Sequence, residues 1–248
     1  MDASDTSRKN ILLQMAGLAG GVAALWLPLF VLLFFGLMPA LGLDVNRFGD
    51  PGHVLPFFAD HPVLIRLAGL VNVVGLTAAG FFGLVLARQL YPAAPGPATL
   101  GGFLTLVAWL LILVAEALDL AAYVSLPATY ARDPSAAGLA FVALQTAGRM
   151  TRTWGYLLVG LGVGALGWGM SRQVGWPRGL SLLGVLGAAV GVVMFTLEYL
   201  FVTQTGDAGG GMAQVFTVLF IATGLIVTLW HAWGGMRLAR GHNETSEV

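Results

Sequence analysis

Six apolar stretches follow one another along the chain, and each is close to the roughly 20 residues that a helix needs to cross a bilayer. Their expected ranges are 11–37, 63–86, 100–126, 154–170, 180–202 and 212–233. The connections between them are mostly short, which favours antiparallel neighbours. The pattern predicts an all-α, polytopic membrane bundle of six transmembrane helices, which forms one integral membrane domain over residues 1–248.

The composition supports this class. Of the 248 residues, 57% are hydrophobic and only 10% are charged, whereas soluble domains carry about 25% charged residues. The formal net charge is zero, so the bilayer is the expected partner and nucleic acid is not, since nucleic-acid-binding surfaces are strongly basic. The absence of cysteine excludes disulfides and thiolate metal sites.

The distribution of basic residues predicts the orientation, because cytoplasmic loops are enriched in Lys and Arg. One side of the predicted bundle holds both termini and Arg8, Lys9, Arg88, Arg172, Arg178, Arg237 and Arg240. The other side holds Arg47, Arg66, Arg132, Arg149 and Arg152. We therefore expect a multi-pass protein of the cell inner membrane with both termini in the cytoplasm.

Landmarks repeat along the chain at a nearly constant offset. An Arg-Gln pair ends both the second and the fourth stretch, at Arg88 and Arg172, and a glutamate lies near the end of both the third and the fifth, at Glu116 and Glu198. The repetition favours two tandem helical hairpins, formed by spans two and three and by spans four and five. The alternative is that unrelated membrane hairpins share basic cytoplasmic turns.

Charged residues within the apolar stretches gather near the non-cytoplasmic side. Positions i, i+3 and i+7 share a helix face, and both Glu116-Asp119-Tyr123 and Arg149-Arg152-Tyr156 have this spacing. Because successive spans alternate in direction, all of these side chains are expected at a similar depth. The predicted cluster comprises Arg66, Glu116, Asp119, Tyr123, Arg149, Arg152, Tyr156 and Glu198.

Two interpretations of this cluster remain open. It is either an ion-pair network that fixes the register of the helices or a polar pocket open to the outer side. In such a pocket the arginines would hold an anionic headgroup or carboxylate, and Glu116 or Glu198 would exchange protons.

Other motifs do not indicate a catalytic, metal or cofactor site. His53, His61 and Asp119 match no metal-site spacing, and only His231 among the histidines lies in an apolar stretch, which argues against haem. Residues 162–167 fit G-x-G-x-x-G but lack the preceding strand of a dinucleotide site. The glycines of the fourth and fifth stretches, including Gly160 and Gly191, instead predict a close helix–helix contact.

The segments Leu64-Ile65-Arg66-Leu67-Ala68-Gly69 and Trp176-Pro177-Arg178-Gly179-Leu180-Ser181-Leu182-Leu183-Gly184 resemble those of a family of bacterial six-span membrane proteins known only as a domain of unknown function. The resemblance covers residues 11–235 and implies the architecture, with no activity and no site residues. The acids Glu116 and Asp119 depart from the family pattern.

Three functions are compatible with these features. The leading interpretation is a non-catalytic accessory protein, or one that binds a small anionic ligand, a lipid or a membrane protein partner. A proton-coupled secondary transporter that uses an intramembrane carboxylate is the first alternative. A membrane enzyme acting on lipids or quinones is the second.

Overall fold

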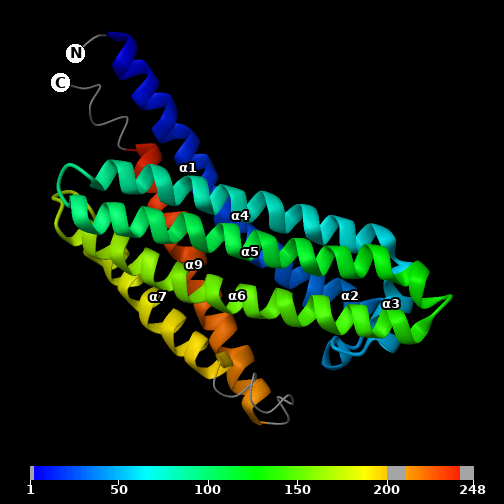
Figure 1. Cartoon of the computed structure of the whole chain (residues 1–248). Coiled ribbons are helices and arrows are strands. Elements are labelled where there is room, and N and C mark those ends of the chain that lie inside the picture. Colours follow the sequence, from blue (N-terminus) through cyan, green and yellow to red (C-terminus); the bar gives the residue numbers. More distant parts are fainter. Residues whose placement is uncertain (1–2, 200–210, 241–248) are drawn as a thin grey trace.

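The computed structural model describes residues 3–199 and 211–240, and within these ranges it contains helices and no strand (Figure 1). The first part comprises α1 (Ala3–Val31), a π-helical turn η1 (Leu32–Leu37), α2 (Met38–Ala40), a 3₁₀ turn η2 (Val45–Arg47) and α3 (Pro51–Asp60). The remainder comprises α4 (Pro62–Leu90), α5 (Pro95–Tyr130), α6 (Pro134–Ser171), α7 (Arg178–Leu197) and α9 (Gly211–Arg240).

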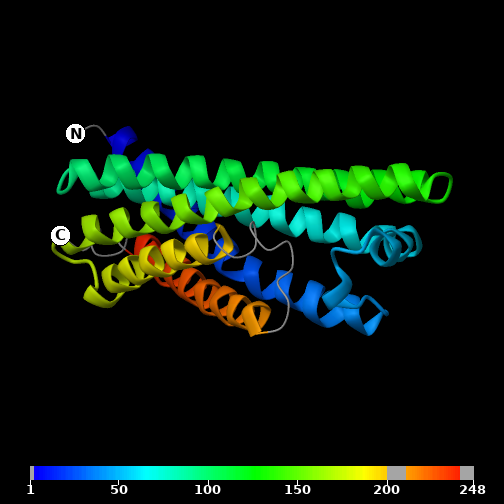
Figure 2. The same ribbon diagram turned by 60° about the horizontal axis from the view of Figure 1, so that its bottom comes forward.

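The long helices form a ring. Going round it, α4 packs on α5, α5 on α6, α6 on α7, α7 on α9, α9 on α1, and α1 back on α4. The two hairpins expected from the repeated landmarks correspond to the neighbouring pairs α4–α5 and α6–α7. Figure 2 shows α7 and α9 on one side of the layer formed by α4, α5 and α6. Each long helix therefore contacts at least two others in a closed ring.

Local sequence explains where the helices begin. Pro62, Pro95 and Pro134 each open a helix, at the position where the missing N–H of proline has no intrahelical partner to lose. Asp133 caps α6, because its carboxylate accepts hydrogen bonds from the backbone N–H groups of Ser135 and Ala136. These bonds, the one to Ala136 most of all, lower the pKa of the Asp133 carboxyl.

The α5–α6 hairpin is longer than the sequence pattern predicts. Residues 127–153 were expected to connect two spans, but α5 continues to Tyr130 and α6 begins at Pro134. With 36 residues, α5 is about 54 Å long at 1.5 Å per residue, compared with a hydrocarbon core of about 30 Å. Helix α5 is therefore longer than the core of a bilayer is thick, and its end at the turn to α6 lies next to α3 (Figure 1).

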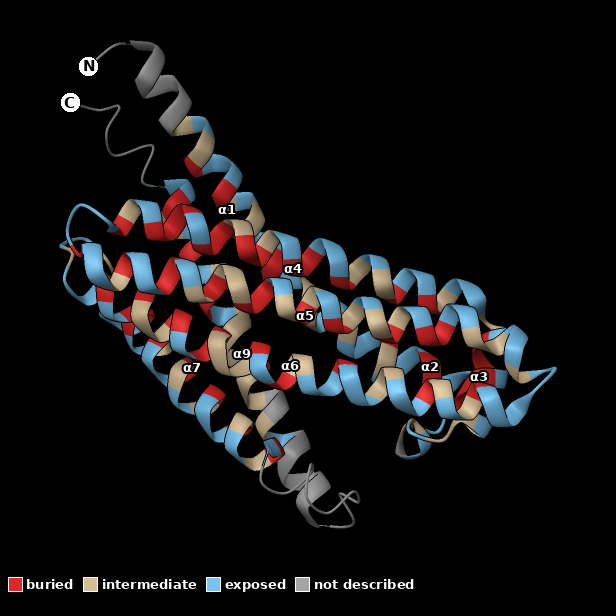
Figure 3. Cartoon of the chain, viewed as in Figure 1, coloured by how far each residue is buried: buried red, intermediate tan, exposed pale blue. Residues whose placement is uncertain are grey.

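The fold is that of a helical membrane bundle. Among the described residues, four segments are long and apolar enough to cross a membrane, namely Asn10–Ala40, Pro62–Leu90, Pro95–Tyr130 and Arg178–Leu197. Their outward faces carry exposed apolar side chains such as Leu18, Leu70 and Phe103, and Figure 3 shows this exposure along the helices. Lipid is the environment in which such surfaces are stable.

Two of the six predicted spans are not among these four segments. Helix α6 has spanning length, but its glycines and the charged Arg149 and Arg152 lower its hydropathy. Helix α9 also has spanning length. The last residues of the predicted fifth span, 200–202, lie outside the described residues.

Glycines bring the helices into close contact. A Cβ atom on Gly160 of α6 would lie 3.1 Å from the Cα atom of Gly191 on α7, and one on Gly184 of α7 would lie 2.9 Å from the Cα atom of Gly167. The predicted close approach of these two helices is confirmed. On the other side of the ring, α1 and α9 cross where Gly20 meets Gly235.

Candidate functional site

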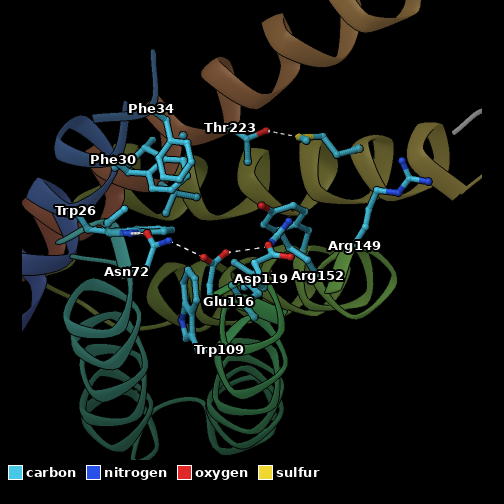
Figure 4. A pocket seen from close by; sticks show the side chains of 18 of the residues that line it. Trp26, Phe30, Phe34, Asn72, Trp109, Glu116, Asp119, Arg149, Arg152 and Thr223 are labelled. Atoms are coloured by element: carbon cyan, nitrogen blue, oxygen red, sulfur yellow. Dashed lines mark hydrogen bonds and ion pairs between the residues drawn. The ribbon is translucent and has the colours of Figure 1, made fainter. Parts of the chain in front are cut away.

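A cavity of about 440 Å³ lies inside the ring of helices. It is lined mainly by apolar and aromatic side chains from all six long helices and from the segment between α1 and α3. Polar side chains occupy one part of the wall, and Figure 4 shows several of them facing one another. These polar residues are Asn72, Glu116, Asp119, Tyr123, Gln145, Arg149, Arg152, Tyr156, Glu198 and Thr223. Two lining residues, Phe35 and Arg149, are exposed at the protein surface, so the cavity communicates with the outside.

The centre of the polar wall is a three-residue ion-pair group. Nη2 of Arg152, on α6, lies 3.2 Å from Oε1 of Glu116 and also pairs with Oδ2 of Asp119, both on α5. The i, i+3 spacing of the two acids places them on adjacent turns of one helix face, as the sequence predicts. One guanidinium thus bridges two carboxylates and fastens α5 to α6.

Hydrogen bonds extend this group in two directions. Nδ2 of Asn72, on α4, donates to Oε2 of Glu116 over 2.6 Å, and Nε1 of Trp26, on α1, donates to Oδ1 of Asn72 over 2.8 Å. At the other end, Nε2 of Gln145 donates to Oδ1 of Asp119 over 3.0 Å. A continuous polar network, drawn partly in Figure 4, therefore links α1, α4, α5 and α6.

Glu198 and Arg149 form a second charged region of the wall. Glu198, just after α7, is buried, and its carboxylate interacts with Thr153 and with Arg149. Arg149 is exposed and lies apart from the Glu116–Arg152–Asp119 group (Figure 4). The cavity thus has two charged regions, one built on α5 and α6 and one shared by α6 and α7.

The two predicted tyrosines also line the cavity. Tyr123 is buried and packs against Phe48, Phe58 and Phe141, which closes the end of the wall nearest α3 with aromatic rings. Tyr156 lies one helical turn after Arg152 and close enough to interact with its guanidinium. Both tyrosines therefore border the charged wall from opposite ends.

Arg66 does not lie with the other residues of the predicted cluster. Its side chain is exposed, and it is not among the residues that line the cavity. The reason is its position on the helix: the neighbouring Ile65 and Ala68 are the buried residues of this turn of α4, so Arg66 points away from the ring. Seven of the eight predicted residues border the cavity, and Arg66 does not.

Sequence reasoning also missed three members of the network: Trp26, Asn72 and Gln145. An amide inside an apolar stretch was a usable signal at Asn72, because a buried polar group needs partners. Gln145 shares a face of α6 with Arg149, Arg152 and Tyr156, but the region around it was expected to be a loop. Trp26 gave no signal beyond its aromatic character.

Two histidines in the described ranges, His53 and His231, have hydrogen-bond partners within the protein. The Nε2 atom of His53 accepts a hydrogen bond from the backbone N–H of Asp44 over 2.8 Å. Nδ1 of the buried His231 lies 2.8 Å from the carbonyl oxygen of Val227. Within the part of the chain that the structure describes, no three histidine or acidic side chains are grouped so that they could hold a metal ion.

Helices of spanning length, lipid-compatible outer faces and a polar interior define an integral membrane protein. The chain belongs to the family described as a domain of unknown function (DUF4386), whose family model matches residues 16–233. The resemblance to a domain-of-unknown-function family is thereby confirmed. No curated protein and no solved structure matches the chain.

Proposed function

We propose that this protein is a six-span inner-membrane protein that binds a small amphipathic or lipid molecule in the cavity and does not catalyse a reaction. The observation that carries the proposal is the cavity itself, about 440 Å³ and polar on one part of its wall. Ligand sites typically measure about 300–1,000 Å³ and combine apolar walls with a few placed polar groups.

In this proposal α6 and α9 are the two further spans. Both complete the ring, and both have at least 30 residues. Exposed aromatic side chains near both ends of the apolar part of α6, Trp154 and Trp168, have the positions expected of interfacial anchors. An even number of spans would put both termini on one side, which the positive-inside rule assigns to the cytoplasm. Figure 1 shows the beginning of α1 and the end of α9 near the same end of the bundle.

In this orientation the polar wall lies toward the non-cytoplasmic surface. Glu116 is about 30 Å along α5 from its first residue, and Glu198 is at a similar distance along α7, given a rise of about 1.5 Å per residue. A lipid or small amphiphile would place its polar group near this level and its apolar part deeper among Trp109, Val159 and Val163, which line the same cavity.

A purely structural role for the ion pairs leaves the cavity unexplained. Arg152, Glu116 and Asp119 could fix the register of α5 and α6 in a solidly packed bundle. The space beside them is instead lined by six helices and bordered by amide and hydroxyl groups. This combination supports ligand binding in addition to the register role.

The proposal is tested by filling the cavity. Val227 of α9 lines it, whereas Val218 on the same helix is 65% exposed outside it. The protein and the variants V227F and V218F are purified in mild detergent, and the molecules that accompany each are measured by native mass spectrometry. We expect a discrete bound species with the parent protein and with V218F, and its loss from V227F. Equal occupancy in all three, or no bound species in any, contradicts the proposal.

A further inference from the structure

The charged side chains of the cavity wall do not balance. Three acids line it, Glu116, Asp119 and Glu198, and only two bases, Arg149 and Arg152. The wall therefore has one more carboxylate than guanidinium. Uncompensated charge is unfavourable in a largely apolar, membrane-embedded site, so a ligand that supplies a positive charge is favoured over one that supplies a negative charge.

The guanidinium of Arg152 is already engaged. Nη2 of Arg152 contacts Glu116 and Asp119 together, and its Nε atom is buried out of reach of a ligand. Arg149 is exposed, and the nearby Glu198 carboxylate attracts it electrostatically. An anionic headgroup at Arg152 would have to displace a carboxylate and would meet the surplus one. The anionic ligand expected from the sequence therefore fits the cavity less well than a cation.

The carboxylate of Glu116 retains the capacity to accept a cation. Each of its oxygens makes one polar contact, to Arg152 and to Asn72 respectively. A carboxylate offers about four acceptor positions, and the Glu116 side chain is 20% exposed. A donor group in the cavity can thus approach Glu116 without breaking the polar network.

Aromatic rings complete the environment of a cation. Trp26 and Trp109 line the cavity and meet edge to face with ring centroids 6.1 Å apart, and Phe30 and Phe34 stack at 4.3 Å. Trp26 is tied through Asn72 to Glu116, so the aromatic wall adjoins the carboxylate. The faces of such rings attract ammonium groups.

We infer that the molecule bound in this cavity is a cationic amphiphile, with an ammonium group beside Glu116 and an apolar body along the aromatic wall. The inference rests on the proposed function, because it requires that the cavity binds an amphiphile at all. It specifies the chemical class of the ligand's polar group.

The test uses three probes with one tail and different heads: dodecyltrimethylammonium, dodecanol and dodecanoate. Their binding to the full-length protein in a neutral maltoside detergent is measured by thermal shift and by titration at neutral pH. We expect the ammonium probe to bind about tenfold more tightly than dodecanoate, a difference of about 1.4 kcal/mol. The E116Q variant should lose most of this preference. The matched control D60N, at an exposed acid of α3 outside the cavity, should keep it.

A second variant keeps the inference falsifiable if E116Q does not fold. Arg149 is exposed, and R149Q enlarges the surplus of acid, so the preference for the ammonium probe should rise. An unchanged or reversed preference in R149Q overturns the inference.

The V227F variant distinguishes failure of this inference from failure of the proposed function. If it abolishes binding of all three probes while dodecanoate binds as tightly as the cation to the parent protein, only the present inference fails. If V227F changes no probe's binding, the cavity is not the site and the proposed function fails.

Discussion

Asn72 of α4 donates a 2.6 Å hydrogen bond to the Glu116 carboxylate of α5, and its own amide oxygen accepts the indole N–H of Trp26. One buried amide thus joins three helices and connects the aromatic wall of the cavity to its charged wall. Both the stability of the bundle and the shape of the cavity depend on this residue.

Replacing Asn72 by leucine should destabilise the protein by about 1–3 kcal/mol, because partners of Glu116 and Trp26 are lost inside the bundle. Titration with dodecyl sulfate, followed by circular dichroism, measures the free energy of unfolding. The control T77V lies on the exposed face of the same helix and should change stability by less than about 0.5 kcal/mol. Equal effects of the two substitutions would mean that the hydrogen bonds contribute nothing.

Removing Arg152 should have a larger effect. R152Q leaves two neighbouring carboxylates without their shared cation, and breaking a buried ion pair in this way costs about 3–5 kcal/mol. The triple variant R152Q/E116Q/D119N removes all three charges at nearly constant shape and should recover most of the loss. The free energies of unfolding of the parent protein, R152Q and the triple variant are compared. A triple variant no more stable than R152Q argues against an electrostatic origin of the loss in stability.

Two glycines on neighbouring helices make a matched pair. A Cβ atom on Gly75 would overlap the indole of Trp26, whereas nothing lies within 4 Å of a Cβ atom on Gly21. We expect G75A to lose about 1–3 kcal/mol through overpacking. G21A should gain up to about 1 kcal/mol, because alanine is the better helix former. Thermal unfolding in detergent measures the change in stability caused by each substitution. Changes of the same sign in G75A and G21A would contradict the packing described around these two glycines.

The start of α3 should depend on pH. The Arg47 guanidinium, 2.6 Å from the Asp50 carboxylate, and the backbone N–H of Gly52 lower the pKa of Asp50 from its ordinary value near 3.8. A lowered pKa in the folded state stabilises the cap above the ordinary value, and this stabilisation is lost as the pH falls through the lowered pKa. Hydrogen exchange at the first amides of α3 should therefore accelerate below about pH 4. The D50N variant should lack this acceleration.

Single introduced cysteines can test the proposed orientation, because the natural chain contains no cysteine that would also react. Val174, in the α6–α7 turn, is fully exposed, and Ser135, in the first turn of α6, is also exposed. In intact cells a membrane-impermeant maleimide should label S135C at once and V174C only after the inner membrane is permeabilised. The reverse pattern would place the termini outside the cytoplasm.

Sequence periodicity predicted the helical class and the gathering of Arg152 with the acids of the preceding span at one depth, since residue spacing fixes which side chains share a helix face. It could not place Arg66, because the orientation of a residue near a helix start depends on how that helix packs. It also treated the segment around Gln145 as a connection, since polar residues interrupt the apolar pattern there. In the structure that segment is held in α6 by the Asp133 cap and by packing on α5.

Trp26 and Trp109, two of the seven tryptophans of the chain, stand in the cavity wall. The protein consequently contains its own optical probe: a molecule that enters the cavity changes the polarity around these indoles. Their fluorescence emission should shift in wavelength or intensity without any attached dye, and a titration can follow it in detergent or in reconstituted vesicles.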